Sequence, residues 1–155
     1  MKWLYRIEEI ICVFLILCAT GVLFINVIFR NFGLGIEWSQ EFIRYSFIWI
    51  TFIGGAICVR YGGHVSIDVI DSFIKEKSRK VILFIATTFS LVFLIWVFLI
   101  GVKAVYFNYS NGQTTPTLSI PIYLVYLAIP LGFLLMIVHY IEILIKLIKK
   151  ERSKE

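Results

Sequence analysis

Charge is scarce in this sequence and almost absent from four long stretches. Asp, Glu, Lys and Arg make up 16% of the 155 residues, whereas hydrophobic residues make up 60%. Soluble domains carry about 25% charged residues, and the segments between the apolar stretches are too short to form a soluble domain. A soluble globular protein is therefore excluded. The apolar stretches cover residues 10–29, 42–59, 81–107 and 120–148.

The chain has only three cysteines and two histidines, and their positions exclude several kinds of site. The cysteines all lie inside apolar stretches without a CxxC pair, so they indicate neither a redox site nor a metal site. His64 and His139 are poorly placed to bind a haem between them. No acidic residue lies in the middle of a stretch, where a coupled carrier usually has one. We therefore expect an accessory membrane subunit without a catalytic, cofactor or metal site, and not an enzyme.

The four apolar stretches predict an all-α integral membrane protein with four transmembrane helices. About 20 apolar residues span a bilayer as a helix, and a helix satisfies its own backbone hydrogen bonds within lipid. We predict one membrane domain, residues 1–155, with spans at about 10–29, 42–59, 81–107 and 120–148. The remaining parts are an amphipathic cytoplasmic connection at 60–80, an extracytoplasmic loop at 108–119 and a basic tail at 149–155.

The basic residues predict the orientation of the spans. All 15 Lys and Arg residues except Arg30, Arg44 and Lys103 lie on the side shared by the N-terminus, the second connection and the C-terminus. Because basic loops stay in the cytoplasm, both termini are expected to be cytoplasmic. The net charge of +5 therefore reflects topology and attraction to membrane lipids, and it does not indicate binding to nucleic acid.

Charged residues at the start of the second span form one candidate site. Glu37, Glu41 and Arg44 recur every three or four positions and so share a helix face. They predict either a solvated helix start with a Glu41–Arg44 ion pair, or a docking point for an extracytoplasmic partner. Ser39 is expected to cap this helix.

Other local patterns inside the spans also lead to predictions. Gly54 and Gly55 allow another backbone to come close, whether it belongs to this chain or to another subunit. Pro130 is expected to bend the last helix. His139 and Glu142 are three positions apart and predict either a hydrogen-bonded pair or a proton relay.

The order of residues in the second span resembles that of a known family. The pattern E-W-x-x-E-x-x-R-Y-x-F-x-W-x-x-F-x-G-x-A at residues 37–56 is similar to the small membrane subunit of tripartite ATP-independent periplasmic (TRAP) transporters, the DctQ-like family. Similar segments are R-x-x-G-H-V-x-I-D at 60–68, T-P-x-L-x-I-P at 115–121 and P-x-G at 130–132. The likeness extends over essentially the whole chain in length and number of spans.

The resemblance implies a role in a multi-subunit transporter of the bacterial inner membrane. Members of this family join a large permease subunit, which carries the substrate and sodium sites and moves as an elevator. A periplasmic substrate-binding protein delivers a carboxylate such as sialic acid or a C4-dicarboxylate. The small subunit is expected to brace the permease and help to dock the binding protein, with no cofactor of its own.

The resemblance also implies two sets of contact residues. The residues implied on the side of the binding protein are Glu37, Glu41, Arg44, Thr115 and Pro116. The residues implied at the interface with the large subunit are Trp49, Gly54, Gly55, His64 and Asp68.

Two other functions stay open from the residues alone. One is an autonomous small transporter that works as a homodimer, which would need a mid-membrane acid in the first span. The other is a membrane anchor of a redox complex, which would need haem-binding histidines on facing helices. The sequence supplies neither pattern, so we favour the accessory subunit.

Overall fold

The chain folds into helices, four of which are long and apolar enough to cross a membrane. The computed structural model describes residues 2–61 and 76–152, and no β-strand lies among them. The candidate spans are Trp3–Asn31, Glu37–Arg60, Phe84–Ser110 and Ile122–Ile145. The prediction of an all-α protein with four membrane-spanning helices is confirmed. The helices are α1 (Lys2–Asn31), α2 (Glu37–Arg60), α4 (Glu76–Ser110), α5 (Ile122–Tyr126) and α6 (Ala128–Arg152).

The long helices extend beyond the apolar stretches that predicted them. α1 begins at Lys2 and α4 at Glu76, several residues before the stretches at 10–29 and 81–107. Helical hydrogen bonding does not stop at the lipid boundary, and Lys, Glu and Arg have good helix propensity. Most of the predicted amphipathic connection lies outside the described residues.

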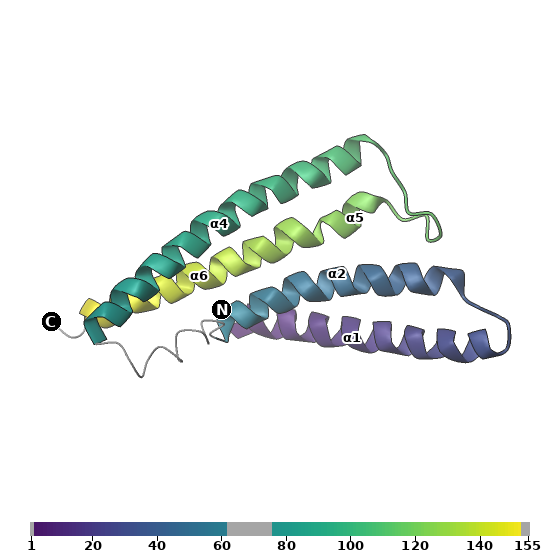
Figure 1. The fold of residues 1–155 in the computed structure, drawn as a ribbon, viewed down its shortest axis with the longest axis horizontal. Helices are drawn as coiled ribbons and strands as arrows, with labels where there is room; N and C mark the ends of the chain where they lie inside the picture. Colours follow the sequence, from purple (N-terminus) through teal and green to yellow (C-terminus); the bar gives the residue numbers. More distant parts are fainter. Residues whose placement is uncertain (1, 62–75, 153–155) are drawn as a thin grey trace.

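The helices lie side by side in a row, in the order α1, α2, α6 and α4. α1 packs on α2, α2 on α6 and α6 on α4, while the short α5 packs mainly on α4 (Figure 1). We name the end toward which α1 begins and α6 ends the terminal end, and the opposite end, with residues 32–36 and 111–121, the loop end. A row leaves more apolar surface for lipid or another protein than a closed bundle does.

Small residues allow α2 and α6 to pack closely. Both helices run from the loop end to the terminal end, so they are parallel neighbours (Figure 1). A Cβ atom on Gly132 would lie 2.5 Å from the Cβ of Phe52 and 3.1 Å from its backbone carbonyl, while one on Gly55 would overlap the end of the Met136 side chain. Within lipid, such close approach stabilises a helix pair through van der Waals contacts.

The last span is interrupted close to Pro130, where the sequence predicts a bend. α5 ends at Tyr126 and α6 begins at Ala128. Proline has no N–H group, so the carbonyl of Tyr126 lacks its usual donor four residues further on. The next backbone hydrogen bond, from Leu131 N to Leu127 O, measures 3.2 Å. The expected disturbance therefore takes the form of a break between two helices.

The turn between α1 and α2 starts the second helix earlier than the sequence predicts. The N-cap is Ile36, which makes no side-chain cap, and its N–H donates to Asn26 Oδ1 of α1 at 3.0 Å. Ser39, the expected cap, lies inside the first turn, where its hydroxyl donates to Ile36 O at 2.6 Å. The capping prediction is wrong because a contact from α1 holds Ile36.

Candidate functional site

Glu41 is the centre of a hydrogen-bonded group at the loop end. The residue is 9% exposed. Its Oε2 accepts the backbone N–H groups of Thr117 (3.0 Å) and Leu118 (2.8 Å), and its Oε1 accepts the Tyr45 hydroxyl (2.7 Å). The Thr115 side chain faces the same carboxylate. A buried carboxylate needs such donors in place of water, so α2 is tied to the loop that precedes α5.

The loop held by Glu41 is also closed by hydrogen bonds of its own. Thr115, 2% exposed, donates its N–H to Ile120 O (2.8 Å) and accepts the Ile120 N–H on its hydroxyl (3.1 Å). The Ile122 N–H donates to Gln113 O at 2.9 Å. Ser119 has a φ of +53°, in the left-handed region that residues other than glycine rarely adopt. These contacts give the loop one defined shape.

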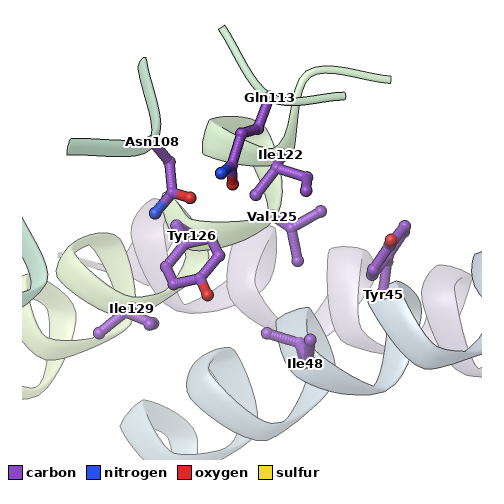
Figure 2. Close-up of a pocket in the computed structure, with 8 residues that line it drawn as sticks. All are labelled: Tyr45, Ile48, Asn108, Gln113, Ile122, Val125, Tyr126 and Ile129. Carbon is purple, nitrogen blue, oxygen red and sulfur yellow. The ribbon is translucent and has the colours of Figure 1, made fainter. Parts of the chain in front are cut away.

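A cavity of about 290 Å³ lies beneath this loop, between α2, α4 and the α5–α6 segment. Figure 2 shows Tyr45 and Ile48 of α2 on one side of it and Asn108 and Gln113 at its upper side. Tyr45 also binds Glu41, so the group around Glu41 shapes the cavity as well as the loop. The lining residues are Tyr45, Ile48, Asn108, Gln113, Ile122, Val125, Tyr126 and Ile129.

The structure brings two of the predicted docking residues together and leaves the others on the surface. Glu37 and Arg44 are exposed on α2, and Pro116 is exposed on the loop. Glu41 and Thr115 are buried against each other. The carboxylate of Glu41 is occupied by the loop instead of by Arg44. Glu41 and Thr115 therefore act on a partner mainly through the shape of the loop.

The predicted large-subunit residues on α2 have different surroundings. Gly55 faces α6 within the chain, whereas a Cβ atom on Gly54 would meet nothing within 4 Å. Trp49 is half-buried. The neighbour of Gly55 is thus a side chain of this chain's own α6, that of Met136, and Gly54 is open to another subunit. His64 and Asp68 lie outside the described residues.

A second polar group lies toward the terminal end, and the sequence did not predict it. Glu8 of α1 is 3% exposed and His139 of α6 is 1% exposed, and His139 Nε2 lies 3.1 Å from both carboxylate oxygens of Glu8. Arg60 of α2 places its Nη1 3.9 Å from Glu8 Oε2 and binds Glu9 through its Nη2. One buried carboxylate thus connects three helices.

Two tyrosines enclose the Arg60 guanidinium. Its central carbon lies 4.7 Å from the centre of the Tyr5 ring and 4.4 Å from the centre of the Tyr61 ring, within the range of a cation–π contact. The Tyr61 hydroxyl donates to Glu9 at 2.8 Å, and the Tyr5 hydroxyl donates to Glu142. The terminal cluster comprises Tyr5, Glu8, Glu9, Arg60, Tyr61, His139 and Glu142.

The terminal cluster corrects one prediction. His139 and Glu142 were expected to bond each other or to form a proton relay, but His139 binds Glu8 and Glu142 binds Tyr5. Both side chains lie near the middle of α6, and they contact α1 close to the point where α1 begins. The available signal was that Glu8, Arg60 and His139 all lie near span ends on the same predicted side.

The four apolar helices and the buried polar contacts between them indicate the class of this protein. The chain is a multi-pass membrane protein that uses its buried polar side chains to hold its own helices together. Its outer surface carries many exposed large apolar residues along all four spans. That combination is typical of a protein whose spans are surrounded by lipid.

Comparison with known proteins identifies the family. The chain matches the family model described as "Tripartite ATP-independent periplasmic transporters, DctQ component" over residues 19–150. It is 32% identical to the C4-dicarboxylate TRAP transporter small permease protein DctQ of Rhodobacter capsulatus over 72% of this chain and 49% of that protein. It is 30% identical to the ectoine TRAP transporter small permease protein TeaB of Halomonas elongata over 84% of this chain and 72% of that protein.

The chain belongs to the DctQ family of TRAP transporter small permease proteins. The match spans about half the length of the Rhodobacter capsulatus relative. A further relative, the sialic acid TRAP transporter permease protein SiaT of Haemophilus influenzae, is 30% identical over 52% of this chain and 13% of that longer protein. The relatives are transporter permease proteins, so the family is one of transporters and not of enzymes. Membership also favours the accessory subunit over a homodimeric carrier or a redox anchor.

Proposed function

We propose that this chain braces a large elevator-type permease subunit of a TRAP transporter and helps to dock a periplasmic substrate-binding protein. Family membership supports the proposal. The SiaT relative supports it further, because there a segment similar to this chain is a small part of one much longer permease protein. A small subunit that packs against a large one reproduces that arrangement with separate chains.

The observation that carries the bracing role is the surface of the helix row. The helices pack along one line, so the two broad faces of the row are apolar and are not covered by the other described helices of the chain. Gly54 lies on such a face, and a Cβ atom there would meet nothing within 4 Å. Membrane helices pack closely where small residues let backbones approach. We therefore infer that the face around Gly54 contacts the large subunit. Trp49 is five positions earlier in α2, about 140° around the helix, and so lies on a different face.

The decisive experiment compares two adjacent glycines. Gly54→Leu fills open space on the outer face, so we expect the chain to keep its own stability but to lose most of its co-purification with the large subunit. Gly55→Leu displaces the end of the Met136 side chain and adds three further carbon atoms between α2 and α6, so it should lower the melting temperature of the chain itself, because overpacking costs about 1–3 kcal/mol. Normal co-purification of Gly54→Leu would remove this face from the interface.

The docking role requires the loop end to face the periplasm. The distribution of Lys and Arg supports cytoplasmic termini and an inner-membrane location. Reporter fusions after residue 112 and at the C-terminus test this orientation. We expect a periplasmic enzyme reporter to be active at the loop position only, and the opposite pattern would reverse the topology.

We further propose sodium-driven uptake of a carboxylate of the sialic acid or C4-dicarboxylate type. The support is that the relatives' names include C4-dicarboxylate and sialic acid, while ectoine in another name shows that the family's substrates vary. Uptake of labelled sialic acid and succinate, with and without a sodium gradient, should depend on this chain. Uptake of neither compound would reject these substrate classes without affecting the bracing role.

A further inference from the structure

We infer that Glu41 is a positioning residue that holds residues 113–121 in one shape, and that the uncharged outer edge of this loop is the surface offered to a soluble protein partner. The inference deepens the proposed docking role and rests on it for the identity of the partner. The contacts of Glu41 stand independently of that role. Through these contacts Glu41 sets the shape of the docking surface from the inner side of the loop, and it does not touch the partner itself.

The carboxylate of Glu41 is a buried anion whose partners in the structure are neutral donors. Two of them are successive backbone N–H groups, of Thr117 and Leu118, and a third is the Tyr45 hydroxyl. Hydrogen bonds to a charged acceptor are stronger than those between neutral groups. If the loop opened, both amides and the carboxylate would lose these bonds together. Glu41 therefore couples the position of α2 to the backbone of the loop.

The backbone of the loop has one strained residue, Ser119, which indicates that surrounding contacts hold the loop in place. Ser119 adopts a φ of +53°, a conformation that is disfavoured for a residue with a Cβ atom. Such conformations persist where surrounding contacts determine them. The bonds between Thr115 and Ile120 on one side and the bonds to Glu41 on the other supply those contacts.

The outer edge of the loop indicates the kind of partner. No Asp, Glu, Lys or Arg occurs from residue 104 to residue 141, so recognition here depends on shape and neutral hydrogen bonds. The exposed residues on this edge are Thr114, Pro116, Thr117 and Ser119. A loop that is already ordered loses less conformational entropy on binding, so a small neutral surface can bind a soluble protein such as a substrate-binding protein without ordering the loop first.

Hydrogen–deuterium exchange of the purified full chain tests the positioning role without any partner. In Glu41→Gln we expect exchange at the amides of Thr117 and Leu118 to rise by about tenfold or more, because local opening becomes easier. The matched control is Glu37→Gln, which removes an exposed carboxylate from the same helix and should leave these amides unchanged.

A second variant keeps the test valid if Glu41→Gln folds poorly. Thr115→Val keeps the size of the side chain but removes the hydroxyl that accepts the Ile120 N–H, and it should also raise exchange across the loop. Equal exchange in wild type, Glu41→Gln and Thr115→Val would overturn the positioning role, whatever happens to transport.

The second part of the inference, that the outer edge of the loop binds a partner, is tested separately. The measurement is the binding of the host's own substrate-binding protein to the intact transporter. We expect weaker binding for Glu41→Gln, and also for Thr117→Arg, which adds bulk at the outer edge while keeping the backbone N–H. If exchange rises but binding is unchanged in both variants, the loop is held by Glu41 but is not the docking surface. That result would reject the loop as the partner surface and leave the proposed docking role to the exposed Glu37 and Arg44 of α2.

Discussion

The two ends of the helix row are held together by different means. At the loop end, a single carboxylate, Glu41, collects neutral donors, two of which belong to the backbone. Toward the terminal end, Glu8, Arg60 and His139 meet from three helices, and every contact depends on a side chain. Both arrangements bury charged groups. They differ in how many residues cannot be replaced without losing a contact.

The two ends are therefore expected to tolerate different substitutions. A backbone N–H is present in every residue except proline, so the loop can vary in sequence as long as Glu41 is kept. The terminal cluster has no such freedom, because removing one partner leaves another buried group without its bond. We therefore expect substitutions in the terminal cluster to affect the whole chain and substitutions in the loop to act locally.

The largest effect is expected for Glu8→Ala. The change leaves the Arg60 guanidinium and His139 without the carboxylate they share, and breaking a buried pair costs about 3–5 kcal/mol. Glu9→Ala is the control, because the Glu9 side chain is 43% exposed and exposed ion pairs contribute little to stability. Thermal unfolding in detergent measures the loss of stability in both variants. Equal shifts would show that burial does not distinguish the two carboxylates.

An intermediate and local effect is expected for Thr117→Pro. Proline removes the N–H that Glu41 accepts, and a hydrogen bond to a charged group contributes about 1.5–3 kcal/mol. Thr117→Ala keeps the N–H and should behave as wild type. Limited proteolysis of the loop reports the change, while the melting temperature of the helices should stay almost the same. A global loss of stability in Thr117→Pro would contradict the local character of the loop end.

The smallest effect is expected for Gly112→Ala. Gly112 has a φ of +59°, and a Cβ atom in that conformation costs about 1–2 kcal/mol. Gly35→Ala is the matched control in the other turn, because Gly35 has open space around it and is not in the left-handed region. Proteolysis at the loop should be faster for Gly112→Ala only. Equal rates would indicate that the turn at Gly112 can rearrange freely.

The spans were predictable because they depend on the composition of the chain. Each apolar stretch must form a helix within lipid, whatever its neighbours are, so the four spans followed from the residues. A bend near Pro130 was also predicted, and the structure has a break between α5 and α6 there. The start of α2 did not follow, because Ser39 was the evident cap and the contact from Asn26 to Ile36 connects two helices.

The candidate site was predictable only in part. The motifs placed Glu41, Thr115 and Pro116 at one end of the membrane, and the structure brings Glu41 and Thr115 together there, while their docking role stays a prediction. Their roles were not predictable, because Glu41 and Thr117 are 76 positions apart and only the fold shows that they bond. The pairing of His139 with Glu142 was expected from their spacing, yet α1 offered both side chains partners across the row.

Two conclusions could be drawn from the sequence alone. One is that this protein crosses the membrane as four helices, and the other, from its motifs, is that it resembles the DctQ family. Local hydropathy and residue order are enough for those conclusions. Only the tertiary structure decided which helices are neighbours, that Gly55 serves the chain's own α6 while Gly54 stays open, and that Glu41 holds a loop. The physical reason is that within lipid all apolar faces are nearly equivalent, so the helix order depends on close packing at glycines and on a few buried polar contacts between distant residues.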